Sequence, residues 1–353
     1  IMASEVGVLE VDPRDVLIKG RLQPGKMFLI DFEEGRMIPD EEIKSEICKS
    51  KPFGEWVSDQ VVDLSALNKS EERLELVEDD LIPRMQSFGY TTETMEFMLM
   101  PLVRELRDPL GSMGNDAALA CLSDKPRLMF DYFKQLFAQV TNPAIDSIRE
   151  EVIMSLECLI GPEGNLLSSR AENAHRLRLK NPILSNEELS NIKNLNQYDW
   201  KTKVIDITYP KEEGHSGILK TIDRVCTESE SAIDNNYSFI VLSDKNLNQQ
   251  NLAISSLLAC SSVNQHLVKN EKRTKTALII ETGEAREVHH HCLLFGYGAD
   301  AINPYLAFEA LWQSQTDGLL NSADITSYED LIGAYKKGVK KGVLKVMAKI
   351  GIS

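Results

Sequence analysis

The stretch FIVLSDKNLNQQNLAISSLLACSSVNQHLVKNEKRTKTALIIE, residues 239–281, decides the fold that this sequence predicts. Two short apolar runs, at 239–243 and 277–281, flank a segment from Leu252 to Val268 whose apolar residues recur at helical spacing. Near-continuous apolar runs of this length are typical of strands that are buried on both faces of a parallel sheet. The stretch therefore predicts a strand, a helical crossover and a second, parallel strand.

The alternation of predicted strands and helices continues on both sides of this stretch. Upstream, the run VIDIT at 204–208 predicts a strand and residues 218–233 predict a helix. Downstream, a helix is expected from about Arg286 to Phe295, followed by a strand at 299–302. This alternation predicts an α/β fold, either partial (β/α) barrel-like or an open parallel sheet with helical crossovers. The sequence pattern leaves both forms open.

A helical segment and a short β-rich piece are expected ahead of the sheet. Residues 4–45 contain short extended runs, at 6–11 and 26–32, separated by proline and glycine. Thr91 or Thr92 is suited to cap a helix that follows it, and Ser185 with Glu188 forms the pattern of a capping box. We predict a partly helical connector over residues 46–100.

The segment between Arg107 and Asn165 is rich in residues that favour loops and helices, and it lacks an obvious nucleophile. Small residues that allow positive φ angles gather just ahead of an apolar run: Gly111, Ser112, Gly114, Asn115 and Asp116. Apolar residues then recur at helical spacing over 128–140 and again over 148–160, on either side of Asn142-Pro143. The pattern predicts a loop followed by two core-facing helices.

Composition narrows the possible partners and compartments. The 353 residues include 54 acidic and 39 basic side chains, a net charge of −15 that disfavours nucleic acid as a partner. No apolar run approaches the length of a membrane span. The six cysteines include no CxxC pair and lie mostly in apolar contexts, which indicates buried thiols in a reducing compartment. An intracellular protein is expected, in the cytoplasm or in the matrix of a mitochondrion or plastid.

The two ends of the sequence predict a fragment of a longer protein. The first residue is Ile1, and the last residues, Gly351 to Ser353, follow an apolar run that predicts the start of a new strand. No targeting segment is visible at such an amino terminus.

Polar residues stand at the predicted carboxyl ends of the strands, where βα architectures place their chemistry. They are Asp206, Ser243 with Asp244, Glu281 with Thr282, and Asn303. One interpretation is a stand-alone (β/α) enzyme that uses these carboxylates and a histidine with a metal. The other is structural, because loop starts and helix caps need the same residue types.

His289, His290 and His291 form the most suggestive metal-binding pattern in the chain. Consecutive helical residues point about 100° apart, so the three rings cannot face one ion, although Glu287 and His291 could. No second HxxxH motif or cysteine pair supports a site. We predict no metal site, with one ring in the core and two near the surface. The chain also lacks a GxSxG elbow, so no catalytic residue is predicted.

Several long blocks of the chain resemble the large subunit of the glutamate synthase family. They cover residues 104–152, 157–165, 281–312 and 341–353, including GSMGND, ECLIGPEGN and KGVLKVMAKIGIS. The resemblance runs end to end and is greater to the pyridine-nucleotide-dependent, eukaryote-like branch than to the ferredoxin-dependent plastid enzymes. It implies the end of a glutamine amidotransferase domain at 1–45, the connector at 46–100, a central domain at 101–330 and the start of an FMN-binding barrel at 331–353.

In this family an amino-terminal cysteine hydrolyses glutamine, and the ammonia crosses an internal tunnel. At a second site it forms 2-iminoglutarate from 2-oxoglutarate, which reduced FMN converts to glutamate with electrons relayed through a 3Fe-4S cluster. The resemblance implies no cofactor and no catalytic residue in this chain. The implied partners are the amidotransferase and FMN domains of the same chain and an NAD(P)H-oxidising FAD subunit or domain, with no nucleic acid and no membrane.

The implied role is to space the two active sites and to contribute walls to the ammonia path. A small polar loop backed by apolar helices suits a passage that admits a neutral molecule and excludes bulk water. The tunnel candidates are Ser112, Gly114, Asn115, Asp116, Thr141 and Asn142. Met347 and Ala348 are cofactor-binding candidates at the start of the FMN barrel. The stand-alone metal-assisted enzyme remains the alternative.

Overall fold

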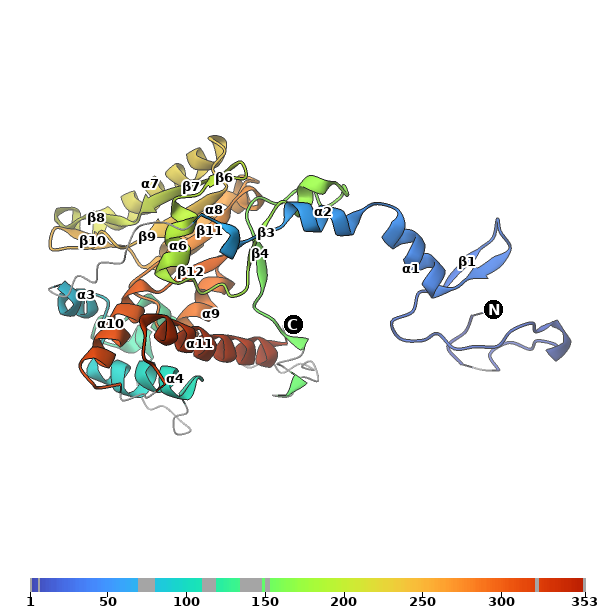
Figure 1. The fold of residues 1–353 in the computed structure, drawn as a ribbon, viewed down its shortest axis with the longest axis horizontal. Coiled ribbons are helices and arrows are strands. Elements are labelled where there is room, and N and C mark those ends of the chain that lie inside the picture. Colours follow the sequence, from blue (N-terminus) through green and yellow to red (C-terminus); the bar gives the residue numbers. More distant parts are fainter. Residues whose placement is uncertain are drawn as a thin grey trace. The chain divides into compact units, whose positions relative to one another are not determined.

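The computed structural model describes residues 2–5, 7–68, 80–109, 119–133, 148–149, 153–320 and 324–351 (Figure 1). The chain divides into two compact units, residues 1–59 and 60–353. No helix in the described ranges combines the length and apolar character needed to cross a membrane.

The first unit is small and has little core. Its elements are η1 (Pro13–Asp15), β1 (Leu29–Asp31), β2 (Arg36–Ile38), α1 (Asp40–Lys49) and α2 (Phe53–Gln60). Strands β1 and β2 form an antiparallel hairpin, whose turn is held by Asp31 Oδ1 accepting the backbone N–H groups of Glu33 and Glu34. Among its described apolar residues only Ile38 and Ile43 are buried. The expected strand at 6–11 is wrong over residues 7–11, which form turns and irregular backbone.

A five-stranded sheet organises the second unit. Its strands are β6 (Asn196–Gln197), β7 (Trp200–Asp206), β9 (Phe239–Ser243), β11 (Ala277–Glu281) and β12 (Ala301–Asn303). The spatial order is β12-β11-β9-β7-β6, and all neighbours are parallel except β6, which forms a hairpin with β7. The strands predicted at 239–243 and 277–281 are confirmed to the residue.

Three helices join the consecutive parallel strands: α7 (Gly214–Asp234), α8 (Ser256–Lys269) and α9 (Val288–Gly296). Strands β8 (Thr208–Pro210) and β10 (Asn251–Ala253) pair as a separate antiparallel ribbon. Because β12 and β6 are the two edges of the sheet, it is open within the described part of the chain. The α/β class with parallel strands and helical crossovers is confirmed, and the barrel-like form is not.

Both faces of the sheet are buried, which explains the continuous apolar strands. Alternate side chains such as Ile240 and Leu242 belong to one core cluster with residues of α7, α8 and α9. Phe239 and Val241 belong to a second cluster on the opposite face. That face is covered by α6 (Asn186–Lys193) and by a small sheet of β3 (Val62–Asp63), β5 (Leu177–Leu179) and β4 (Cys158–Ile160).

A group of helices packs beside the sheet (Figure 1). It contains α3 (Leu81–Ser87), a π-helical turn (Thr94–Leu99), α4 (Met100–Glu105), α10 (Tyr305–Thr316) and α11 (Tyr328–Ile350). Helix α11 contacts α4, α9 and α10. Gly338 permits the close approach of α11 to α4, since a Cβ atom there would lie 2.8 Å from the carbonyl oxygen of Leu102.

Three local predictions differ from the structure, and in the first two tertiary contacts decide between helix and strand. The strand expected near residue 343 is the last part of α11, where Val339, Val343 and Leu344 remain buried at helical spacing. The helix expected over 148–160 is wrong over residues 154–160, which are irregular backbone followed by β4, whose residues pair antiparallel with β5. The helix expected over 128–140 begins only as a short 3₁₀ turn, η6 (Met129–Tyr132), and residues 134–147 lie outside the described ranges.

Candidate functional site

The polar residues predicted at the strand ends form one row across the sheet. Asp206 is in register with Ser243, Ser243 with Glu281, and Glu281 with Asn303. Their predicted position at the carboxyl ends of the strands is confirmed, and the sheet places them side by side. Their hydrogen bonds determine whether the row is a reactive site or part of the structural framework.

Glu281 is the centre of the row and is only 3% exposed. Lys193, at the end of α6, donates to both of its carboxylate oxygens at 2.7 Å. The hydroxyl of Ser243 donates to Oε2 at 2.5 Å. A buried carboxylate held by an ammonium and a hydroxyl is a satisfied ion pair. Glu281 therefore anchors α6 to the end of β11.

The outer members of the row are also engaged by the fold itself. Asp206 accepts the backbone N–H of Thr208 at 2.8 Å and the amide of Asn246 at 2.9 Å. The Asn303 amide donates to the carbonyl of Leu184 and to Asn186 Oδ1, which ties β12 to the start of α6. These hydrogen bonds join the carboxyl ends of β7 and β12 to neighbouring segments of the chain.

Asp244, one residue beyond the row, is 1% exposed and bonded to neutral groups. Its carboxyl oxygens accept the backbone N–H of Gly283 at 3.0 Å and the hydroxyl of Tyr305 at 2.9 Å. Burial raises its pKa to about 8, although these hydrogen bonds act in the opposite direction. Asp244 is therefore largely protonated at neutral pH and joins β9 to the loop after β11.

The loop from Thr282 to Glu287 reaches parts of the chain that are distant in sequence. The buried guanidinium of Arg286 donates to the carbonyls of Phe88 and Gly89 and lies 4.3 Å from the ring centre of Tyr90. Tyr90 in turn donates to the carbonyl of Gly283 at 3.1 Å. A Cβ atom at Gly283 would lie 2.4 Å from the ring of Phe88, so this close approach requires glycine. We name Thr282–Glu287 the hub loop.

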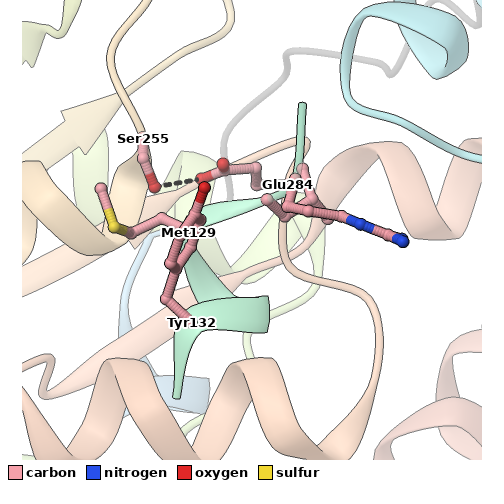
Figure 2. Close-up of a pocket in the computed structure, with 6 residues that line it drawn as sticks. Met129, Tyr132, Ser255 and Glu284 are labelled. Atoms are coloured by element: carbon pink, nitrogen blue, oxygen red, sulfur yellow. Dashed lines mark hydrogen bonds between the residues drawn. The ribbon is translucent and has the colours of Figure 1, made fainter. Parts of the chain in front are cut away.

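Glu284 of the hub loop lines a surface pocket at the start of α8 (Figure 2). The pocket has a volume of about 420 Å³ and also contains Met129, Tyr132 and Ser255. Glu284 Oε2 accepts the hydroxyls of Ser255 and Ser256 and the backbone N–H of Ser256, at 2.8 to 3.0 Å. The carboxylate thereby caps α8, so the polar wall of this pocket is itself a structural contact.

The three histidines of α9 make three different contacts. His289 is partly buried, while His290 and His291 are 2% and 0% exposed, so the expectation of one core ring and two surface rings is wrong. His291 Nε2 donates to Tyr335 Oη at 2.8 Å, because the Tyr335 hydroxyl itself donates to the carbonyl of Arg286. Burial lowers the pKa of His291 to about 3 and keeps the ring neutral. Glu287 pairs with His290 at 3.0 Å and not with His291.

The side chains that the metal-assisted alternative would use are engaged by other residues of the chain. Glu281 is held by Lys193, while His291 is held by Tyr335. Within the described ranges no group of three or more histidine, cysteine, aspartate or glutamate side chains has the arrangement of a metal site.

The cysteines are free thiols, and their burial differs from the prediction. Cys226 and Cys260 are buried and Cys158 and Cys292 are partly buried, but Cys48 and Cys121 are exposed. Burial raises the pKa of Cys158 to about 11 and that of Cys260 to about 12, which makes both thiols poor nucleophiles.

The tunnel candidates lie outside the described residues. They are Ser112, Gly114, Asn115, Asp116, Thr141 and Asn142. Met347 and Ala348 lie in the last turns of α11, partly buried against the core. Their side chains carry no charge and no hydrogen-bond donor, so they could offer a flavin only apolar contact. Their role in cofactor binding stays a prediction.

The fold and the closed polar row define a class of protein. It is an α/β domain whose strand-end polar residues bond to its own framework. Residues 83–353 match the family model described as the glutamate synthase central domain, and residues 1–56 match class-II glutamine amidotransferases. The chain belongs to the glutamate synthase family. The domain boundaries predicted at 45, 100 and 330 remain predictions.

Similar proteins cover the whole chain. The glutamate synthase [NADH] of Schizosaccharomyces pombe is 45% identical over 100% of the chain, which spans 17% of that relative. The glutamate synthase [NADPH] large chain of Bacillus subtilis is 45% identical over 100% of the chain, which spans 22% of it. The glutamate synthase [NADH] of Saccharomyces cerevisiae is 43% identical over 100% of the chain, and the chain spans 17% of it. The chain therefore represents about a fifth of the length of these relatives.

Proposed function

We propose that this chain is the central connecting segment of a glutamate synthase. It spaces the glutaminase and synthase sites and contributes to the path of ammonia, and it carries no catalytic residue. The complete enzyme would convert L-glutamine, 2-oxoglutarate and a reduced electron donor into two molecules of L-glutamate. The donor is NADH or NADPH, a proposal supported by the names of the three relatives.

The cofactors and partners of this proposal lie in the rest of the enzyme. FMN and a 3Fe-4S cluster would carry out the redox chemistry there, and an NAD(P)H-oxidising FAD subunit or domain would supply the electrons. The flanking amidotransferase and FMN domains are the direct neighbours of this segment in the same chain.

The closed polar row carries the proposal. The residues best placed for chemistry, at the carboxyl ends of the parallel strands, are engaged by Lys193, Asn246 and Asn186. A carboxylate that accepts an internal ammonium and hydroxyl is poorly available as a base or a metal ligand. The row therefore supports a framework role, with the chemistry in the neighbouring domains.

The experiment uses the full-length enzyme with tryptophan placed at the tunnel candidates. We expect Ser112→Trp or Thr141→Trp to obstruct the path, so that ammonia from glutamine escapes into solution. The measured quantity is 2-oxoglutarate consumed per glutamine hydrolysed, which should fall to about half or less of the wild-type value, an effect of about 0.4 kcal/mol or more on partitioning.

The control is Thr227→Trp, at an exposed position on α7. It should leave the ratio unchanged. An unchanged ratio in both folded tunnel variants would overturn the assignment of these positions to the ammonia path.

A further inference from the structure

The surface pocket of Figure 2 has two walls from distant parts of the chain. Arg127, Leu128, Met129 and Tyr132 form one wall at the turn η6, and Ser255 and Glu284 form the other at the start of α8. The volume of about 420 Å³ lies within the range of about 300–1,000 Å³ that is typical of small-molecule sites. The pocket is therefore large enough to hold a small organic ligand.

Glu284 uses only one of its two carboxylate oxygens to hold the fold. The residue is 7% exposed, and its hydrogen bonds from Ser255 and Ser256 all end on Oε2. Among the residues that the structure describes, none donates to Oε1. The donors to Oε2 are hydroxyls and a backbone N–H, so none of them carries a positive charge. A largely buried carboxylate with a free oxygen favours a cation with N–H donors as its further partner.

Arg127 gives the same pocket a positive group with unused donors. The residue is exposed, and its Nε donates to the hydroxyl of Ser123 at 3.3 Å. Its two terminal nitrogens have no acceptor in the described part of the chain, where no ion pair joins Arg127 to Glu284. A guanidinium can bind a carboxylate through two parallel hydrogen bonds. The pocket thus offers separate partners for a carboxylate and for an ammonium group.

The rest of the lining is apolar or aromatic. Leu128 and Met129 are partly buried against the main core cluster, while Tyr132 is 52% exposed. Figure 2 shows the Tyr132 side chain extending towards the Glu284 carboxylate. Apolar side chains and a tyrosine ring can remove the surface of an aliphatic group from water. The lining therefore favours a ligand with an apolar side chain.

We propose that this pocket binds a free α-amino acid with an apolar side chain. Glu284 Oε1 accepts the ammonium group, and Arg127 binds the carboxylate. Leu128, Met129 and Tyr132 cover the side chain. The inference concerns a binding site and does not depend on the ammonia path, so it can fail while the proposed function stands.

The test measures binding of L-leucine to the full-length enzyme by isothermal titration calorimetry. Two analogues each lack one charged group: 3-methylbutylamine lacks the carboxylate, and 4-methylpentanoate lacks the ammonium. We expect saturable binding of L-leucine with a Kd of about 1 mM or lower, which is a modest affinity for a ligand of this size. Each analogue should bind at least about tenfold more weakly, because it loses one charge-assisted set of hydrogen bonds.

Two substitutions assign the two ends of the ligand. Glu284→Gln keeps one oxygen for Ser255 and Ser256 but replaces the free oxygen with an amide donor, so the ammonium loses its partner. L-leucine should then bind this variant no better than 4-methylpentanoate binds the wild type. Arg127→Gln removes the partner of the carboxylate, so L-leucine should bind it no better than 3-methylbutylamine binds the wild type.

The control is Arg170→Gln, at an exposed arginine that does not line the pocket. It should leave the Kd of L-leucine unchanged. Should Glu284→Gln fail to fold, the exposed position of Arg127 and the two analogues still test the proposal.

Three results would overturn the proposal. The first is a wild-type enzyme that shows no saturable binding of L-leucine. The second is an equal Kd of L-leucine in the wild type and in folded Arg127→Gln. The third is equal binding of L-leucine and 3-methylbutylamine, because the pocket would then take a cation without a carboxylate.

Discussion

The polar row at the strand ends and the hub loop that follows it differ in where their partners come from. The row is closed by elements close to the sheet edge, such as Lys193 on α6 and Asn246 after β9. The hub loop instead bonds to residues nearly 200 positions away, since Arg286 and Phe88 are 198 residues apart. The polar row resembles a catalytic site, but its side chains bond the sheet to neighbouring elements. The hub loop joins segments of the second unit that are far apart in the sequence.

The largest effect should follow from breaking the hub loop. Arg286→Met would leave the carbonyls of Phe88, Gly89 and Glu284 without the donor that the guanidinium supplies. The bonds to Phe88 and Glu284 are buried, whereas Gly89 is exposed. Two buried carbonyls left unsatisfied at roughly 1–3 kcal/mol each give an expected loss of about 4 kcal/mol in the free energy of unfolding. Urea unfolding of the 353-residue chain, followed by circular dichroism, measures it.

The control for this change is an arginine at a partly exposed ion pair. Arg178 pairs with Asp63 at 2.8 Å, with side chains 37% and 41% exposed. Arg178→Met should cost about 1 kcal/mol or less, because solvent screens such pairs. Equal losses in the two variants would contradict the distinction between the hub loop and ordinary ion pairs.

The next largest effect should come from the row. Glu281→Gln leaves Lys193, whose side chain is 23% exposed, without its charge partner. Removing one member of a buried pair costs about 3–5 kcal/mol. Because Lys193 is partly exposed, we expect the free energy of unfolding to fall by about 3 kcal/mol. The same unfolding experiment checks it. A loss below about 1 kcal/mol would mean that the row does not hold α6 to the sheet.

The pH dependence of stability should reveal Asp244, which links the two regions. Burial raises its pKa from 3.8 to about 8. Between these two values the unfolded state releases the proton and the folded state retains it, so the free energy of unfolding falls as pH rises towards 8. His291 acts in the opposite direction, because its pKa falls from 6.5 to about 3 and stability is lost below pH 6.5.

Asp244 should therefore lower stability between pH 6.5 and pH 8 by up to about 1.4 kcal/mol per pH unit. Asp244→Asn should remove this slope, as measured by urea midpoints at a series of pH values. A slope that persists in the variant would assign the titration to another group.

The smallest effect concerns the start of α6, next to the row. The Ser185 hydroxyl accepts the backbone N–H of Glu188 at 3.1 Å, and the Glu188 carboxylate accepts the N–H of Ser185 at 2.7 Å. Ser185→Ala should cost about 1 kcal/mol. Ser216→Ala, which removes one exposed bond to the carbonyl of Glu213, should cost less than about 0.5 kcal/mol. Thermal unfolding of both variants distinguishes the capping contact from a surface bond.

The sheet was predictable from sequence and the hub loop was not. The apolar strand runs, the capping box and the polar residues at the strand ends are local signals, and each was confirmed. The partners of Arg286 and Tyr90 depend on which segments fold together, and no local pattern contains that information. For the same reason the periodicity near residue 158 indicated a helix where pairing with β5 makes a strand.

The histidine motif shows the same limit at single residues. Helical spacing showed that the three rings cannot share one ion, but it did not predict that His290 and His291 would both be buried. Their burial depends on Phe130 and Tyr335, which approach α9 from remote parts of the sequence.

The central claim is that the row serves the framework and that the chemistry lies elsewhere. The most direct test is an assay of the purified 353-residue chain for glutamine hydrolysis and for glutamate formation from ammonium, 2-oxoglutarate and a reduced donor. We predict no turnover of either kind above the buffer blank. Turnover that disappears in folded Glu281→Gln would contradict the claim, because it would make the strand-end row an active site.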